Sequence, residues 1–224
     1  MIVAIVPAAG RSERMGKPKL ILPIHGETVI ARVVTTLRQG GIPRVVVVAP
    51  PSETPGAAIL ANEATSAGAV VVVPKERPLD MRGSFQLGLE QLLEGPSPTA
   101  IMLTPADSPG ITSALVARVL AEARNAPGSI IIPTFLGRRG HPIVIPWGLA
   151  LQVSSLPLGA GINALMAFQA SRILEIAVDE PGTLDDLDTP DDYQRWVGSK
   201  KASLARQAEL SSPAEELRQS EVLD

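Results

Sequence analysis

The sequence predicts an α/β protein with a doubly wound, mostly parallel sheet and helices on both faces. Five short apolar runs rich in β-branched residues recur along the chain, at Ile2–Val6, Val45–Ala49, Ala69–Val73, Ala100–Thr104 and Ser129–Ile132. Apolar runs of this length are typical of strands that are buried on both faces of a parallel sheet. Helix-length segments separate the runs, and regular alternation of strand and helix indicates βαβ units.

The predicted helices fill the gaps between these strands, and most of them end at glycines. They cover Glu27–Gln39, Glu53–Ala67, Ser84–Leu93 and a segment from Thr112 to Asn125. Gly40, Gly68 and Gly95 follow three of the helix ends, as expected of C-terminal stop signals. Ser84 and Thr112 are predicted to act as N-caps, because their hydroxyls can accept from free backbone N–H groups.

The pattern becomes less regular after residue 140. A strand is expected at Pro142–Ile145, a helix from about Gly161 to Ala170, a strand at Ile173–Val178 and a short helix at Pro190–Val197. We therefore predict one domain over residues 1–197. Residues 198–224 are polar and charged with little apolar surface to bury, which predicts an appendage that is helical or partly ordered.

Composition restricts the classes of function. The 224 residues are 45% hydrophobic, which is enough for a core, but only 3% aromatic, which disfavours a base-stacking platform. The net charge is −3, so nucleic acid and anionic membrane are not expected partners. The chain has no cysteine and no apolar run of the ~18 residues that a membrane span needs. We expect a cytoplasmic protein.

The loop after the first strand combines small residues with positive charge. Ala8, Ala9 and Gly10 allow backbone N–H groups to approach a ligand closely, and such groups form anion-binding nests. Arg11, Arg14, Lys17 and Lys19 follow within ten residues. Because Arg and Lys both bind phosphate oxygens, the loop predicts a polyphosphate site. The alternative is a solvated basic loop.

Two common nucleotide-binding patterns are absent from this loop. A P-loop needs a second glycine five residues after the first, where this chain has Met15. The G-x-G-x-x-G fingerprint of dinucleotide-binding folds is also missing, which disfavours an NAD-dependent oxidoreductase.

Acidic residues follow the fourth strand and precede the last predicted helix. Asp107 lies just beyond a strand end, where a carboxylate can hold Mg²⁺ beside phosphates, although it can also cap the helix starting near Ile111. Asp186 and Asp188 would face one side of an extended segment, and such a pair repels unless a cation intervenes. Helix capping accounts for the residues from Thr189 to Asp192 without needing these two.

The segment PAAGRSERMGKPK resembles the signature L-A-A-G-x-S-x-R-M-G-x-x-K of MobA-like NTP transferases, and more closely their molybdenum cofactor cytidylyltransferase branch. Eight positions are in register, namely Ala8, Ala9, Gly10, Ser12, Arg14, Met15, Gly16 and Lys19. The resemblance implies a Rossmann-like nucleotidyltransferase fold. It also implies that this loop, with Arg11, binds the nucleotide, while Arg14 and Lys19 act catalytically on charge at the α-phosphate.

Two acidic segments also resemble the family. Asp107-Ser108-Pro109 is similar to its G-D-x-P element, with Ala106 in place of the glycine. DLDTPDD is similar to its D-I-D-T-P-E-D segment, in which the second aspartate, here Asp188, joins the metal site. The resemblance implies a catalytic role for Asp107 and a site for Mg²⁺, or Mn²⁺ in its place, held by Asp107 and Asp188.

The remaining resemblances concern the two substrates. Gly140 and His141 match a G-x-x-G-H-P element on the side of the second substrate, whereas a lone histidine on its own favours a structural hydrogen bond. Ser84 lies in a segment similar to one that contributes to nucleotide binding. The G-P-L-x-G stretch usual in the guanylyl-transferring branch is absent, which favours CTP over GTP.

These resemblances predict transfer of CMP from CTP to a phosphate-bearing acceptor, most closely molybdenum-bearing molybdopterin, with release of pyrophosphate. A molybdoenzyme that receives the cofactor is a further expected partner. The alternatives are GTP as donor, a sugar or polyol phosphate as acceptor, and a non-catalytic protein that delivers nucleotide or cofactor.

Overall fold

The structure, a computed structural model, describes residues 1–198, so the predicted appendage from residue 199 onward lies outside the described residues. The main-sheet strands are β1 (Ile2–Pro7), β4 (Val45–Val48), β5 (Val70–Val72), β6 (Ala100–Leu103), β7 (Ile130–Phe135), β8 (Arg138–Arg139), β9 (Ile143–Pro146) and β10 (Ile173–Ala177). Among the described residues they form an eight-stranded sheet in the order β10-β7-β9-β6-β1-β4-β5, with β8 paired to β7. The predicted fold class is confirmed.

Strand β9 reverses direction within this sheet. β1 pairs in parallel with β4 and β6, whereas β9 pairs antiparallel with both β6 and β7. The chain returns from β7 through the short β8 turn, and a connection this short joins antiparallel strands only. The start of β9, rather than its end, therefore lies at the edge where the parallel strands end.

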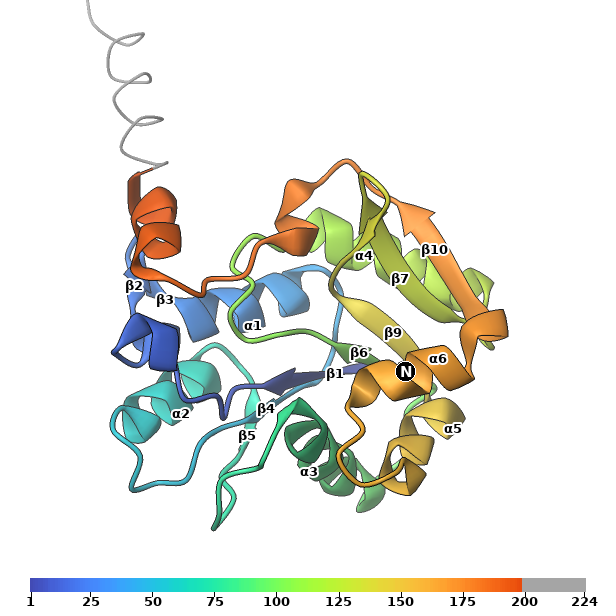
Figure 1. Cartoon of the computed structure of the whole chain (residues 1–224), viewed down its shortest axis with the longest axis horizontal. Coiled ribbons are helices and arrows are strands. Elements are labelled where there is room, and N and C mark those ends of the chain that lie inside the picture. The colour runs from blue at the N-terminus through green and yellow to red at the C-terminus, as the bar shows by residue number, and fades with distance from the viewer. Residues whose placement is uncertain (199–224) are drawn as a thin grey trace, which may run out of the picture.

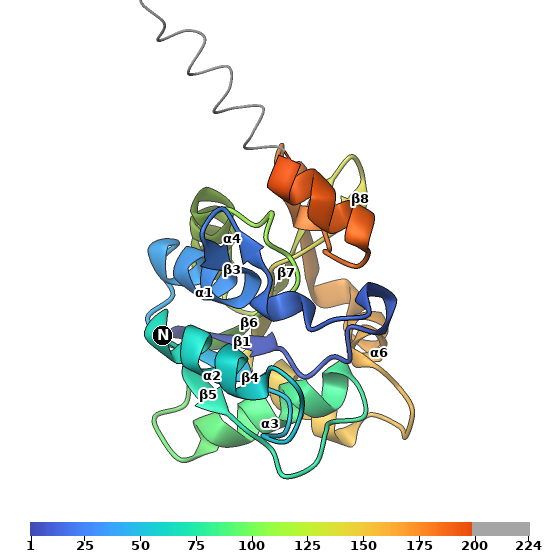
Figure 2. The ribbon, with the colours of Figure 1, turned by 90° about the vertical axis from the view of Figure 1, so that its left-hand side faces the viewer.

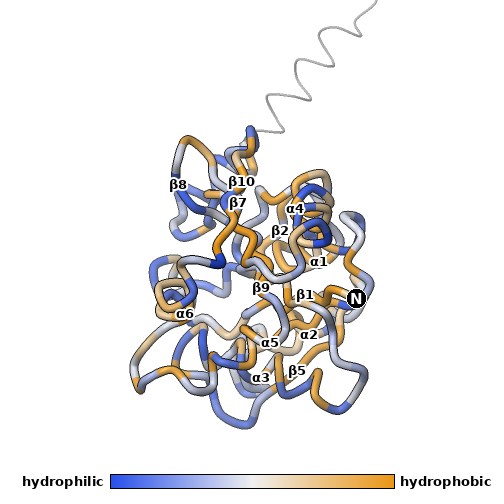
Figure 3. Tube along the Cα trace, turned by 90° about the vertical axis from the view of Figure 1, so that its right-hand side faces the viewer, coloured by the Kyte–Doolittle hydropathy of each residue, from blue (hydrophilic) through white to orange (hydrophobic). Residues whose placement is uncertain are grey.

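Helices α1 (Val29–Gln39), α2 (Ala57–Ser66) and α4 (Ser113–Asn125) pack on one face of the sheet, and α3 (Met81–Leu93), α5 (Trp147–Ala150) and α6 (Ile162–Phe168) pack on the other. Figure 1 shows α1 and α4 on one side of the strands and α3 and α5 on the other. Side chains of β1 alternate between the faces, with Ala4 and Val6 toward α1 and Val3 and Ile5 toward α3. Strands β7 and β9 are accordingly hydrophobic over most of their length (Figure 3).

The helix caps agree with the sequence at one position and differ at another. Thr112 caps α4, where its hydroxyl accepts from the Leu115 N–H at 3.1 Å. The prediction that Ser84 caps α3 is wrong, because the helix begins at Met81 and the Asp80 carboxylate accepts from the Gly83 N–H at 2.8 Å. Asp and Ser are both favoured N-cap residues, and in this fold the Asp80 side chain is the one that reaches the free N–H.

Short elements complete the chain. They are the hairpin strands β2 (Pro23–Ile24) and β3 (Glu27–Thr28) and the 3-10 helices η1 (Glu13–Met15), η2 (Lys19–Ile21), η3 (Leu151–Ser155), η4 (Ala170–Arg172) and η5 (Pro181–Leu184). Residues 190–198 are helical and lie beside the hairpin (Figures 1 and 2), where the Tyr193 hydroxyl donates to the Pro23 carbonyl at 2.8 Å. Within residues 1–198, no helix has the length and apolar character needed to cross a bilayer.

Candidate active site

A cleft of about 570 Å³ opens at the carboxyl ends of β1 and β6, where ligands bind in folds of this kind. Its walls come from the loop after β1, the segment before and within α3, and the two acidic segments. Ten of the predicted site residues line it, namely Ala8, Ala9, Gly10, Arg11, Ser12, Arg14, Lys19, Ser84, Asp107 and Asp188. The structure thus brings together residues that are far apart in the sequence.

The loop after β1 is shaped by two residues in the left-handed region. Ser12 has φ 53° and Gly16 has φ 64°, and these bracket the single turn η1. The Ser12 hydroxyl accepts from the Lys19 N–H at 3.3 Å, which closes the loop on itself. This curvature turns Arg14 and Lys19 toward the acidic segments across the cleft.

Four charged side chains meet at one edge of the cleft, and we call Arg14, Lys19, Asp107 and Asp188 the charged rim. The Lys19 ammonium lies 2.6 Å from Asp107 Oδ2 and 3.0 Å from Asp188 Oδ1. Arg14 Nη2 lies 2.9 Å from the same Asp188 oxygen. The Lys19 side chain is only 12% exposed, so its charge needs partners. Burial alone would lower the pKa of Lys19, but the Asp107 and Asp188 carboxylates outweigh it and raise that pKa above its ordinary value.

The two acids of the 186–188 segment have different partners. Asp186 accepts from the Ser108 hydroxyl at 3.0 Å, whereas Asp188 contacts the cations of the rim. Between them, the Leu187 N–H donates to the Asp107 carbonyl at 2.8 Å. Loss of solvent raises the pKa of Asp186 against the opposing hydrogen bond from Ser108. The segment is therefore fastened to the β6–α4 loop at Asp186 and Leu187, and to the loop after β1 at Asp188.

Gly140 and His141 lie outside the set of residues that line the cleft. The His141 N–H donates to the Thr183 carbonyl at 2.9 Å, and the Thr183 hydroxyl donates to the His141 carbonyl at 2.6 Å. Burial lowers the pKa of His141 despite the nearby Asp107 charge, so the imidazole is neutral at pH 7. Its buried Nδ1 has no hydrogen-bond partner among the described residues. Contact of these two residues with a second substrate stays a prediction.

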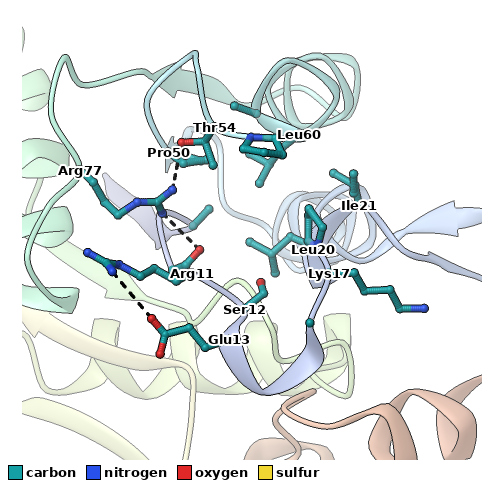
Figure 4. Close-up of a pocket in the computed structure, with 17 residues that line it drawn as sticks. Arg11, Ser12, Glu13, Lys17, Leu20, Ile21, Pro50, Thr54, Leu60 and Arg77 are labelled. Atoms are coloured by element: carbon teal, nitrogen blue, oxygen red, sulfur yellow. Dashed lines mark hydrogen bonds and ion pairs between the residues drawn. The ribbon is translucent and has the colours of Figure 1, made fainter.

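Arg77 is a cleft residue that the sequence analysis did not single out. Its guanidinium donates to the carbonyls of Ala9 and Gly10 and, at 2.9 Å, to the Thr54 hydroxyl. Figure 4 shows Arg77 reaching from its own segment toward Thr54 and the loop after β1. The signal available in the sequence was its place in a loop that follows a parallel strand.

Behind the loop after β1 lies a second cavity of about 370 Å³ (Figure 4). Leu20, Ile21 and Leu60 contribute much of its lining. Seven residues, Arg77 among them, line both this cavity and the cleft, so the two compartments share a wall.

Comparison with known proteins gives a family match over most of the chain. The sequence profile of the MobA-like NTP transferase domain matches residues 4–175. A protein named nicotine blue oxidoreductase from Paenarthrobacter nicotinovorans is 27% identical over 205 residues, covering 88% of this chain and 96% of its own length. A molybdenum cofactor guanylyltransferase from Xanthomonas euvesicatoria pv. vesicatoria is 30% identical over 121 residues, covering 54% of each chain.

A solved structure agrees with the fold. Rv0371c from Mycobacterium tuberculosis H37Rv, crystallised in complex with manganese, is 26% identical and superposes with a TM-score of 0.71, covering 88% of this chain and 98% of its own.

Proposed function

The chain belongs to the MobA-like NTP transferase family, and on that premise we propose that it transfers CMP from CTP to a phosphate-bearing small molecule. The observation that carries the proposal is the position of Lys19, whose ammonium lies within 3.0 Å of carboxylates from two other segments. This arrangement lies in a cleft lined by the small residues of the loop after β1. A triphosphate, a cation and their counter-charges can therefore meet at one place.

The triphosphate would bind along the loop after β1. Small residues there allow a phosphate to approach the backbone closely, and the helical turn η1 carries Arg14 toward the cleft. Lys19 and Arg14 are paired with carboxylates of the charged rim. A phosphate that enters the cleft offers these cations negatively charged oxygens, as the carboxylates do. Lys19 and Arg14 can therefore exchange a carboxylate for a phosphate without being left unpaired.

The reaction would be an in-line displacement. An oxygen of the acceptor phosphate attacks the α-phosphorus of CTP and forms a new P–O bond. The bond from that phosphorus to the bridging α–β oxygen breaks, and pyrophosphate leaves with the electron pair. An acceptor phosphate is already anionic near neutral pH, so the step needs no strong general base. Catalysis then consists of positioning the reactants and stabilising charge, which Arg14 and Lys19 supply.

Asp107 and Asp188 would hold a divalent cation, Mg²⁺ or Mn²⁺. Within residues 1–198 no group of three or more His, Cys, Asp or Glu side chains is arranged to enclose a metal. Both carboxylates nevertheless face one cation, the Lys19 ammonium, and Mg²⁺ typically takes one or two carboxylates plus substrate phosphates. When bound, the ion supplies positive charge to phosphate oxygens. The manganese complex of the mycobacterial relative supports this assignment.

CTP is proposed as the donor because the G-P-L-x-G stretch is absent from this chain. The guanylyltransferase named among the relatives makes GTP the alternative donor. We propose molybdenum-bearing molybdopterin as the acceptor, with sugar and polyol phosphates as alternatives. The oxidoreductase name of another relative suggests hydride transfer, but this chain lacks the dinucleotide fingerprint in the loop after β1.

Pyrophosphate release tests the proposal. The purified chain is incubated with CTP, GTP, ATP or UTP, with Mg²⁺ or Mn²⁺, and with or without candidate phosphate acceptors. We expect acceptor-dependent release that is fastest with CTP. Faster pyrophosphate release with GTP would identify GTP as the donor. Nucleotide binding without pyrophosphate release under any condition would indicate a delivery protein. Failure of all four nucleotides to raise the melting temperature would overturn the proposal altogether.

A further inference from the structure

Three backbone segments meet beneath the charged rim with almost no space between them. We call Gly110, Gly140, Gly182 and Thr183 the glycine seam. A Cβ atom added at Gly182 would lie 2.0 Å from the Gly110 carbonyl oxygen, and one added at Gly140 would lie 2.3 Å from the Thr183 carbonyl oxygen. Real Cβ atoms essentially never approach below 3.0 Å. The seam therefore fixes how closely these segments pack.

Thr183 connects two of these segments by a reciprocal pair of hydrogen bonds. Its carbonyl accepts from the His141 N–H at 2.9 Å, and its hydroxyl donates to the His141 carbonyl at 2.6 Å. The residue is buried, with 3% of its surface exposed. Loss of either bond would leave a polar backbone group of His141 without this partner. Thr183 itself does not line the cleft.

The chain between the glycine seam and Asp188 is short and is anchored by hydrogen bonds. Four residues separate Thr183 from Asp188 along the sequence, and the Asp185 N–H donates back to the Gly182 carbonyl at 3.4 Å. The Leu187 N–H then donates to the carbonyl of Asp107, and the Leu187 side chain is fully buried. Gly110, three residues after Asp107, belongs to the same seam. The segments that carry the two acids are thus packed against one another at Gly110 and Gly182.

We infer, on the premise of the proposed function, that Thr183 is a positioning residue that sets the spacing between Asp107 and Asp188. It would act together with Gly140, whose missing side chain leaves room for the Thr183 carbonyl. This gives the Gly140–His141 element a role that does not depend on touching the acceptor. Disturbing the seam would change metal binding and turnover, while the loop after β1 would keep its own contacts with the nucleotide.

The test replaces Thr183→Val, which removes the hydroxyl at nearly constant volume, and Thr183→Ser, which keeps it. Thr134→Val is the matched control, because Thr134 is also buried and its hydroxyl donates to the carbonyl of Ile176, away from the acids. Mn²⁺ binding is measured by electron paramagnetic resonance with and without CTP, and CTP binding by calorimetry without metal. Mutating a residue that orients metal ligands without touching the metal typically changes metal affinity about 10- to 100-fold.

We expect Thr183→Val to weaken Mn²⁺ binding by about 10-fold or more with CTP affinity changed less than about 2-fold, and Thr183→Ser to restore it. Thr134→Val should leave both affinities unchanged. Wild-type Mn²⁺ affinity in a folded Thr183→Val protein would overturn the inference. If that variant does not fold, Gly140→Ala is measured against Gly128→Ala, where an added Cβ meets no atom within 4 Å. Absence of CTP binding by the wild-type chain would instead count against the proposed function, and the Mn²⁺ series without CTP would still test the seam.

Discussion

The charged rim and the glycine seam are neighbours held together by opposite means. Rim contacts are made by charged side chains whose nitrogen and oxygen atoms lie 2.6 to 3.0 Å apart, and a charged ligand entering the cleft would compete for either partner of such a pair. Seam contacts are made by backbone atoms and the Thr183 hydroxyl, and they leave no space for an added carbon at Gly140 or Gly182. The difference shows how a site can keep exchangeable charges in place, because a sterically fixed frame carries them.

Removing the central cation of the rim should have the largest effect on activity. Lys19→Ala deletes the charge that both acids share and that the triphosphate would take over, so we expect kcat to fall about 100- to 1,000-fold. The melting temperature should stay near that of the wild type. Steady-state pyrophosphate release measures the loss, with Lys75→Ala as a control for an exposed lysine outside the cleft. Similar rates for Lys19→Ala and the wild type would remove Lys19 from the site.

Neutralising the acids of the rim should abolish the response to metal. Asp107→Asn and Asp188→Asn each keep the size of the side chain but remove one negative charge. We expect each to raise the Mg²⁺ concentration for half-maximal rate by at least about 10-fold. Titration of the rate with MgCl₂ at saturating CTP measures this shift. An unchanged titration for either variant would show that the carboxylate in question pairs only with the cations of the charged rim.

Substitutions in the glycine seam should lower the free energy of unfolding, because they disturb packing rather than charge. Gly182→Ala forces a carbon onto the Gly110 carbonyl, and overpacking of this kind costs about 1–3 kcal/mol. Urea unfolding measures the difference in the free energy of unfolding. Gly128→Ala, which meets open space, should stay within about 0.5 kcal/mol of the wild type. Equal stability of the two variants would mean that the seam can yield, and the contrast with the rim would disappear.

The smallest expected effect concerns the helix cap formed by Asp192, which holds the C-terminal end of the 186–188 segment. Asp192 accepts from the N–H groups of Asp188 and Thr189 at 3.0 and 2.7 Å, and the Thr189 hydroxyl accepts from the Asp192 N–H. Such a capping box contributes about 1 kcal/mol, so we expect Asp192→Ala to lower the free energy of unfolding by that amount at pH 7.

This cap also predicts a pH dependence. Hydrogen bonding with Thr189 lowers the pKa of Asp192 below its unfolded value, so its contribution is present above that value, about pH 4, and is lost as pH falls through the folded pKa. The stability gap between wild type and Asp192→Ala should therefore narrow below about pH 4. Asp191→Ala, at an exposed neighbour, serves as the control. A gap that widens on acidification would show that the cap does not depend on the ionised carboxylate.

Much of the fold could be predicted because it depends on local patterns. Runs such as Val45–Ala49 are apolar because both faces of the sheet are covered, and this is visible in the sequence itself. The direction of β9 could not be predicted, since an apolar run has no orientation and the short β8 turn settles it. The start of α3 was missed because Asp80 and Ser84 are both good caps, and the choice between them depends on tertiary packing.

The charged residues of the candidate site could be predicted from the sequence, whereas most of the residues that hold them in place could not. Arg14, Lys19 and Asp107 follow strand ends, so the rule for parallel sheets places them at one edge. That rule examines loops after strands, so it did not point to Thr183, which lies in a 3-10 helix. His141 precedes the reversed strand β9 and was singled out by the family resemblance rather than by this rule. Arg77 escaped notice because a single arginine in a loop has no spacing pattern. Its hydrogen bonds are made to carbonyl groups of the loop after β1, which is distant in the sequence.

Arg77 places one side chain in the wall that the cleft and the second cavity share. Its guanidinium is held by backbone carbonyls of the loop after β1 on one side and by the Thr54 hydroxyl on the other. A shorter residue at this position would give up both contacts and widen the space beside the loop. Substrate size could then be altered without any change to the acids or to the glycine seam.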